Sequence, residues 1–450
     1  MVAVEIPGYY YDEEKRKYFK VLPSGSAGGA SSSTFYTPDR IAKRLKPDHY
    51  GNRTHDDHLA RRSMPSRTRL ADHASLSASL STGSRRELEA RAFAARLART
   101  NTLWHRARLD MVGVTCIDIS SPSSPSSPMV WVGNVHGVYK EYDATRFLRE
   151  STYQLDITTP FAEFGGQVAS ISQSGSFRVV TAYTDNDFNA MVCAPSDNAS
   201  TTSSLPLSSS SSSIWYRIQK FSVPTHAHCS AVSIIPGTHL AIGGAGRLML
   251  YPCSLSNSHS HSHPPLRTFK LKSDLFALQS FQPHAYLAGT RDGAVTVFDS
   301  RVARQQQPSL FHASAITKMK LVNDLFLITA GLDDSLSMYD LRFAKSNSAS
   351  SSSSSMPVIT YQGYFNQHTF GHGFDVSNDG SLLAVADQSN KVKLFSVWTG
   401  NPLQCQLSTS KFKVIPHALK WMDTFSVNSV TMTDGLLVPN GARLEYWSLG

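Results

Sequence analysis

The chain has 450 residues, of which 41% are hydrophobic and 17% are charged, and it carries a net charge of +9. No stretch approaches the roughly 18 consecutive apolar residues that a membrane span needs, and charges stand where a signal peptide would have its apolar core. The five cysteines are scattered, without the short paired spacing of a disulfide framework or a zinc site. We therefore expect no membrane association and a reducing compartment, the nucleus or the cytoplasm.

The positive charge is concentrated in the first quarter of the chain. Residues 1–110 hold 20 lysines and arginines against 12 acidic residues, so the remaining body is nearly neutral. A basic tail can contact nucleic acid or serve in nuclear import, although a solvated linker is the more common explanation. The body has no basic aromatic platform of the kind that single-strand binders use, so we do not expect nucleic acid as a partner.

Three segments precede the main body. Residues 1–25 form an aromatic motif, in which Tyr9–Tyr11 and Tyr18–Val21 predict a hairpin around a charged turn. Residues 26–83 are a basic linker that we expect to be disordered. Residues 84–100 predict an amphipathic helix with Leu88, Ala92, Phe93 and Leu97 as its apolar stripe. This helix either packs against the following domain or offers Leu88 and Phe93 to a partner's groove.

From residue 111 onward one unit recurs: an apolar strand, a turn, a second apolar strand, a polar turn and a third strand that ends in an aromatic residue. The seven copies are residues 111–143, 168–193, 230–253, 275–301, 315–343, 374–397 and 418–450. Such repeats are typical of a β-propeller with four-stranded blades. We predict an all-β fold over residues 101–450, a seven-bladed propeller that resembles the WD-repeat proteins.

The last copy predicts how the ring closes. It stops at its third strand, RLEYWSL, and an open blade edge would invite aggregation. We therefore expect the segment Leu103–Leu109 to supply the fourth strand of the last blade.

Four serine-rich inserts interrupt the repeats, at residues 120–128, 199–213, 254–265 and 346–355. They are too polar to bury a face, and we expect them to be disordered. The first separates strands one and two of its blade and the others separate strands three and four. Both connections emerge on one face of a propeller, so the opposite face should be free of inserts.

No motif of a known catalytic or phosphate-binding site is present. The cluster His259, His261 and His263 could hold a metal but sits in a polar insert. We predict that the protein is not an enzyme and that it uses no cofactor and no metal.

The ends of two consecutive third strands carry the same pattern, Phe298-Asp299-Ser300-Arg301 and Tyr339-Asp340-Leu341-Arg342. Together with the preceding residues, from 286 and 327 respectively, they resemble the WD-repeat subset that docks on cullin-4 ubiquitin ligases. Blade packing requires no guanidinium at a strand exit, whereas a planar donor fork suits a partner's carboxylate or carbonyl. Arg301 and Arg342, with Asp299 and Asp340, are therefore the candidate partner-binding residues.

Other parts of the same pattern are expected to be structural. The resemblance to WD repeats implies a buried hydrogen-bond network of His312, Thr329, Asp333 and Tyr339 in the fifth blade.

The segment IPGYYYDEEKRKYFKVLPSG, residues 6–25, is similar to the N-terminal segment of the WD-repeat cullin-4-associated factors, most closely the fourth group of that numbered series. This resemblance implies a substrate-recognition subunit that docks on the ligase's propeller adaptor through Arg301, Arg342 and the helix, and that holds an unidentified protein substrate elsewhere. Similar tyrosine hairpins occur in splicing-factor repeats, so a scaffold in RNA or ribosome processing, with the basic tail on RNA, stays open.

Overall fold

The computed structural model describes residues 9–12, 17–20, 87–88, 90–92, 94, 105–108, 113–120, 129–144, 162–184, 188–195, 216–224, 226–253, 264–302, 308–343, 355–423, 425–427, 430–432, 434–441 and 443–448. The chain divides into two compact units, Met1–Asp72 and His73–Gly450. The described part of the first unit is a hairpin of β1 (Tyr9–Asp12) and β2 (Lys17–Lys20). Its antiparallel register pairs Tyr11 with Tyr18, in agreement with the predicted hairpin.

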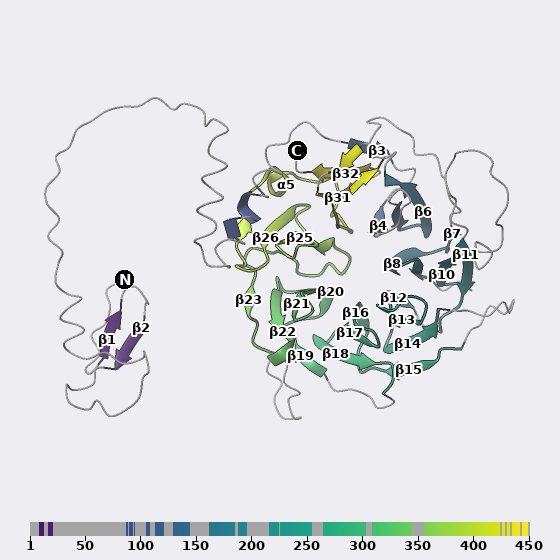
Figure 1. Ribbon diagram of the computed structural model, residues 1–450, viewed down its shortest axis with the longest axis horizontal. Helices are drawn as coiled ribbons and strands as arrows, with labels where there is room; N and C mark the ends of the chain where they lie inside the picture. The colour runs from purple at the N-terminus through teal and green to yellow at the C-terminus, as the bar shows by residue number, and fades with distance from the viewer. Residues whose placement is uncertain are drawn as a thin grey trace. The chain divides into compact units, whose positions relative to one another are not determined.

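The second unit is a ring of seven four-stranded antiparallel sheets, which confirms the predicted seven-bladed propeller (Figure 1). Blades 1 and 2 consist of β4 (Val114–Ile119), β5 (Met129–Asn134), β6 (Val138–Asp143) and β7 (Ala162–Glu163), and of β8 (Gln167–Ser174), β9 (Phe177–Tyr183), β10 (Ala190–Pro195) and β11 (Tyr216–Phe221). Blades 3 and 4 consist of β12 (Ala227–Val232), β13 (His239–Gly244), β14 (Arg247–Pro252) and β15 (Arg267–Lys270), and of β16 (Leu275–Gln282), β17 (Ala285–Thr290), β18 (Ala294–Asp299) and β19 (Pro308–Phe311).

Blades 5 and 6 consist of β20 (Ile316–Val322), β21 (Phe326–Gly331), β22 (Leu336–Asp340) and β23 (Ile359–Thr360), and of β24 (Phe374–Val376), β25 (Leu382–Ala386), β26 (Val392–Ser396) and β27 (Pro402–Leu403). Blade 7 consists of β28 (Lys420–Met422), β31 (Gly435–Asn440), β32 (Arg443–Ser448) and β3 (His105–Arg108). A small hairpin, β29 (Phe425–Val427) and β30 (Val430–Met432), lies between β28 and β31 in the sequence.

Ring closure follows the prediction from the sequence. Strand β3 pairs with β32 in antiparallel register, with Ala107 opposite Leu444 and His105 opposite Tyr446. The last blade thus takes its fourth strand from a segment more than 300 residues earlier in the sequence, and its edge is paired.

The hydrophobic core lies between the faces of neighbouring blades. One cluster, for example, joins Leu287 and Val295 of blade 4 to Leu327 and Tyr339 of blade 5, and all four side chains are buried. Strand residues that point to alternate faces of a blade therefore reach both neighbours, so the central strands of each blade read as nearly continuous apolar runs. The first strand of each blade contributes residues to the central cavity, and Figure 1 shows β4, β8, β12, β16 and β20 at the centre of the ring.

The connections of the blades define two faces of the ring. Because the strands of a blade are antiparallel, the connections between strands one and two and between strands three and four lie on one face, and the start of strand one lies on the other. The four serine-rich inserts, nearly all of which lie outside the described residues, fall in the connections β4–β5, β10–β11, β14–β15 and β22–β23. We call the face with these connections the insert face and its opposite the open face.

A helix before β3 packs on the ring. The helical residues that are described are 87–88, 90–92 and 94. Ala90 and Ala94 are buried in a cluster with residues of blades 6 and 7, and Thr399 donates a hydrogen bond to Glu87 at 2.8 Å. Leu88 points outward and is 51% exposed, whereas Phe93 lies outside the described residues. Ala90 and Ala94 therefore pack on the ring, whereas Leu88 and Ala92 of the predicted stripe are exposed; Leu97, like Phe93, lies outside the described residues.

Among the described residues, no helix combines the length and the apolar character needed to cross a bilayer.

Candidate protein-binding surface

The two strand exits singled out in the sequence have the same local structure. Asp299 is the last residue of β18, and its Oδ1 accepts a hydrogen bond from the backbone N–H of Arg301 at 2.9 Å. The guanidinium of Arg301 then returns to the same carboxylate, with Nε to Oδ1 at 3.0 Å and Nη2 to Oδ2 at 2.7 Å. This is a turn closed by an aspartate side chain and locked by a bidentate ion pair.

The exit of the next blade repeats this arrangement. Asp340 ends β22 and accepts from the backbone N–H of Arg342 at 2.9 Å, while Arg342 Nη2 lies 2.6 Å from Asp340 Oδ2. The following residues form a short 3-10 turn, η2 (Leu341–Phe343). The guanidinium of Arg342 also lies 5.8 Å from the ring of Phe326 and 5.7 Å from that of Phe343, within cation–π range.

The ion pairs satisfy the aspartates but not the arginines. Hydrogen bonds from Arg301 lower the pKa of Asp299 to about 2, and those from Arg342 lower the pKa of Asp340. The guanidinium has five N–H donors, and the side chains of Arg301 and Arg342 are 68% and 55% exposed. Each arginine is therefore held in one orientation with donors left over for a partner.

A third arginine supports the first exit, and sequence reasoning missed it. Arg267, in the fourth strand of blade 3, donates from Nη1 to the carbonyl oxygens of Ser300 and Val302, both at 2.8 Å. It thereby fixes the turn that carries Arg301. A lone arginine at the start of an edge strand gives no signal in the sequence, because its partners lie over 30 residues away.

Apolar side chains accompany the arginines on the insert face. Leu325 lies in the β20–β21 turn, and its carbonyl accepts from the backbone N–H of Leu341 at 2.9 Å. The exposed large apolar residues described in the insert-face connections of blades 3 to 5 are Ile234, Ile235, Leu266, Val302, Leu325, Phe343, Met356 and Val358. Exposed apolar groups next to ordered arginines are typical of protein-binding surfaces.

The helix reaches the same face. Thr399, the partner of Glu87, lies in the connection between strands three and four of blade 6, so the start of the helix meets the insert face one blade beyond Arg342. The hydroxyls of Ser396 and Thr399 and the guanidinium of Arg91 lower the pKa of Glu87, against the opposing effect of its burial. The exposed Leu88 next to it remains a candidate for partner contact.

The buried network in blade 5 includes three of the four predicted residues. His312 Nδ1 lies 2.9 Å from the hydroxyl of Tyr339 and 3.0 Å from that of Thr329. Its other ring nitrogen lies 2.9 Å from the hydroxyl of Ser335, not from Asp333. Burial lowers the pKa of His312 to about 4, so the ring is neutral at pH 7.

The assignment of Asp333 to this network is wrong. Asp333 and Asp334 both adopt left-handed backbone conformations, with φ of 54° and 58°, and Asp333 is exposed. The turn therefore carries Asp333 outward and brings Ser335 beneath the imidazole.

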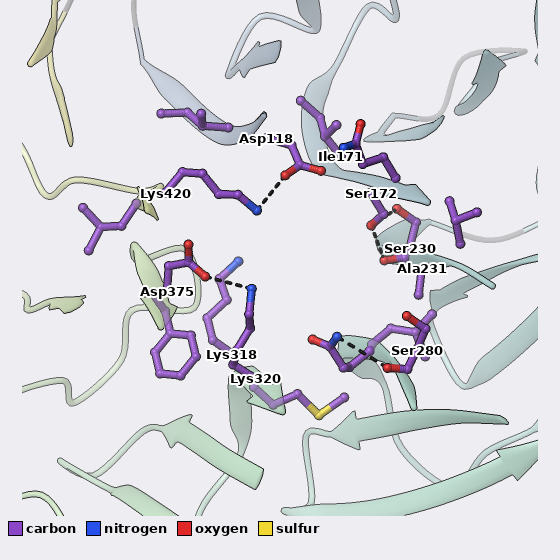
Figure 2. A pocket seen from close by; sticks show the side chains of 18 residues that line it. Asp118, Ile171, Ser172, Ser230, Ala231, Ser280, Lys318, Lys320, Asp375 and Lys420 are labelled. Atoms are coloured by element: carbon purple, nitrogen blue, oxygen red, sulfur yellow. Dashed lines mark hydrogen bonds and ion pairs between the residues drawn. The ribbon is translucent and has the colours of Figure 1, made fainter. Parts of the chain in front are cut away.

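The centre of the ring is a channel with a cavity of about 260 Å³ (Figure 2). One layer of its lining contains Lys320, Asp375, Lys420 and Asp118, which come from the first strands of blades 5, 6, 7 and 1. Lys320 Nζ lies 2.9 Å from Asp375, and Lys420 Nζ lies 2.7 Å from Asp118. The second ion pair crosses the seam between the last and the first blade, so this layer has a structural role in closing the ring.

Within the described residues, no group of three His, Cys, Asp or Glu side chains could hold a metal ion. His259, His261 and His263 lie outside these residues.

The molecule is a seven-bladed β-propeller of four-stranded antiparallel blades, the architecture of WD-repeat proteins, which serve in general as non-catalytic scaffolds for protein binding. Its sequence is similar to that of WD repeat-containing protein 21 of Schizosaccharomyces pombe (strain 972 / ATCC 24843), with 23% identity over 180 residues. The match covers 40% of this protein and only 40% of the length of that relative. No protein-family model matches the sequence. The similarity and the seven-bladed ring together support placing the protein among the WD-repeat proteins.

Proposed function

We propose that this propeller is the substrate-recognition subunit of a cullin-4 RING ubiquitin ligase and that it docks on the ligase's propeller adaptor through its insert face. The observation that carries the proposal is the pair of identical exits in adjacent blades. In each, an aspartate fixes an exposed arginine with unused donors, at 68% and 55% side-chain exposure. In this proposal the ligase's other subunits perform the chemistry, and this protein only binds.

Three further features support docking on this face. Arg342 is flanked by the exposed ring of Phe343, and Leu325 and Val302 add apolar area beside the two exits. The helix start meets the same face at Thr399, so its exposed Leu88 can extend the contact. Protein interfaces commonly place aromatic and arginine anchors at their centre.

The test is co-purification of the adaptor with the tagged full-length protein from eukaryotic cells. The double variant Arg301→Ala with Arg342→Ala should reduce adaptor recovery at least tenfold, since anchors of this kind dominate binding. Its melting temperature should stay nearly unchanged, because both side chains are more than half exposed and neither is part of the buried core. Arg247→Ala is the matched control: this exposed arginine begins β14 at the open face, and its loss should leave adaptor recovery intact.

Other outcomes decide against the proposal. A folded double variant that recovers the adaptor fully contradicts docking through the exits. If Leu88→Asp then abolishes recovery, the helix alone carries the contact. Recovery of ribonucleoprotein components in place of adaptor and cullin peptides favours the scaffold in RNA or ribosome processing.

A further inference from the structure

Lys318 occupies a position that blade packing fills with small side chains. The first strands of blades 1 to 5 each contain a β-bulge near their start. The residues directly after the five bulges are Cys116, Ser170, Cys229, Ala277 and Lys318. Four of the five are small, so the fold at this position does not require a lysine.

The ammonium group of Lys318 differs from its neighbours in lacking a counter-charge. The channel residues Lys320 and Lys420 are each paired with an aspartate, whereas within the part of the protein that the structure describes the ammonium group of Lys318 takes part in no ion pair or hydrogen bond. Figure 2 shows its side chain extending into the channel beside that of Lys320. An unpaired charge that is partly removed from water costs free energy, and burial accordingly lowers the pKa of Lys318.

The nearby sulfur atoms cannot neutralise this lysine. Cys116 and Cys229 are the groups whose charge would affect it most. Burial raises the pKa of Cys116 to about 12 and that of Cys229 further still, so both thiols are neutral at pH 7. The positive charge is thus left for a ligand to balance.

The lining of the channel favours a single negative charge. Its ionised groups are three lysines and two aspartates, which leaves one positive charge. The remaining polar groups include the hydroxyls of Ser172 and Ser280 and the amide of Gln173. A carboxylate matches this charge, whereas a phosphate dianion would leave an excess negative charge beside Asp118 and Asp375.

Five aromatic and histidine rings are in contact with one another at the open face of the ring. Tyr183 stacks on His226 at 4.8 Å and on His228 at 5.4 Å between ring centroids; His228 contacts Phe276 at 5.1 Å, and Phe276 contacts Phe370 at 4.8 Å. We call these five residues the aromatic arc. Tyr183 and Phe370 are 48% and 39% exposed.

The arc and Lys318 lie toward the same face. Tyr183 ends a second strand, and the other four residues lie at or before the start of first strands, all positions at the open face. His228 and Phe276 are the extra residues of their bulges, and a bulge turns a side chain out of the regular packing. Lys318 is the third residue of β20 and so lies closer to this face than Lys320 does.

We propose that the channel binds a carboxylate of a partner polypeptide on Lys318, from an Asp or Glu side chain or from the partner's C-terminus, while neighbouring partner residues pack on the aromatic arc. Tyrosine and phenylalanine supply contact area at low entropic cost. The site is on the face opposite to the two strand-exit arginines, so it holds whether or not the protein docks on a ligase adaptor.

The test uses the purified full-length protein and three fluorescent heptapeptide pools, measured by fluorescence polarisation. All three pools contain mixed aromatic and aliphatic positions. The first has Glu or Asp at an internal position and a C-terminal amide, the second has Gln or Asn there and a free C-terminus, and the third has Gln or Asn and an amide. We expect the first or the second pool to bind and the third to bind at least tenfold more weakly, and the better of the first two identifies the source of the carboxylate.

Variants assign the binding to the channel. Lys318→Met should lower the affinity for the carboxylate-containing pool at least tenfold, and Lys318→Arg should retain part of that affinity. The control is Lys411→Met, which removes the same charge from an exposed lysine outside the channel and should leave the affinity unchanged. Equal binding by Lys318→Met and the parent protein, or no binding by any pool, overturns the proposal. So does Lys318-dependent binding of inorganic phosphate that is tighter than that of every peptide pool.

Discussion

Cations stand in two different environments in this propeller. At the strand exits, Arg301 and Arg342 are more than half exposed, and each is held by the aspartate two residues before it. In the channel, Lys318 has no acidic partner among the described residues, although two aspartates are within the same cavity and pair with other lysines. The two exit arginines are held in a fixed orientation at little cost in folding free energy, because their charges are paired and exposed. The charge of Lys318, in contrast, is partly buried and unpaired within the described part of the chain. A charge that the fold leaves unbalanced is the stronger sign of a ligand.

The largest effect on stability is expected in the paired layer of the channel. Asp375 accepts from Lys320 Nζ at 2.9 Å and from the backbone N–H of Trp421 at 2.9 Å. In Asp375→Asn the ammonium of Lys320 loses its counter-charge and meets an amide that can itself present N–H groups. We expect a loss of about 2–3 kcal/mol in the free energy of unfolding, below the full cost of breaking a buried pair because Lys320 is partly exposed.

Chemical denaturation measures this loss. Asp299→Asn at the strand exit is the control, since it removes an aspartate from an exposed pair, and it should leave the midpoint unchanged. Equal losses in the two variants would show that the channel pairs are no more structural than the exits.

The second prediction concerns Lys318 itself and has the opposite sign. Burial lowers its pKa below the ordinary value of 10.5, so the unfolded state binds this proton more tightly than the folded state. The free energy of unfolding therefore rises with pH between the lowered pKa and 10.5, and the full penalty applies below that window. Lys318→Met removes the penalty and should stabilise the protein by about 1 kcal/mol at pH 7.

This gain should disappear as the pH approaches 10.5, which thermal melts across a pH series can follow. The charged and titratable groups that face the site or act on it electrostatically are Lys320, Lys420, Asp118, Asp375, Cys116, Cys229 and His372. A stabilisation that is independent of pH would mean that the methionine acts through better packing alone.

The fold could be predicted from the sequence because each blade repeats a local signal. Apolar strands, polar turns and an aromatic strand end recur seven times, and the missing fourth strand of the last copy indicates that an earlier segment closes the ring. The Asp-x-Arg pattern at the strand exits could be predicted for the same reason, since Asp299 and Arg301 are only two residues apart in the sequence.

The channel was not predicted, because its partners meet only in the folded ring. Lys420 and Asp118 are separated by about 300 residues, and the sequence Lys318-Met319-Lys320 alternates like any half-exposed strand. Only the structure aligns the first strands on their bulges, and this alignment places Lys318 where blades 1 to 4 have cysteine, serine, cysteine and alanine. The error at Asp333 has a different cause, since the left-handed turn at residues 333–334 shifts the network partner to Ser335.

The smallest effect is expected at the exits. Arg301→Met removes the same charge as Lys318→Met and puts in the same side chain, but from an exposed pair that solvent screens. Its melting temperature should match that of the parent protein at every pH from 6 to about 10, in contrast to Lys318→Met.

The effect of Arg301→Met should appear instead in the titration of Asp299, whose pKa of about 2 depends first on the side-chain hydrogen bonds from Arg301. Carbon-detected NMR of the carboxyl group should show this pKa rising toward the ordinary value of 3.8 but not reaching it, because the backbone N–H of residue 301 still donates to the carboxylate. A variant that melts lower, or an Asp299 pKa that does not move, would mean that the exit pair is part of the fold and that the two environments differ less than their geometry indicates.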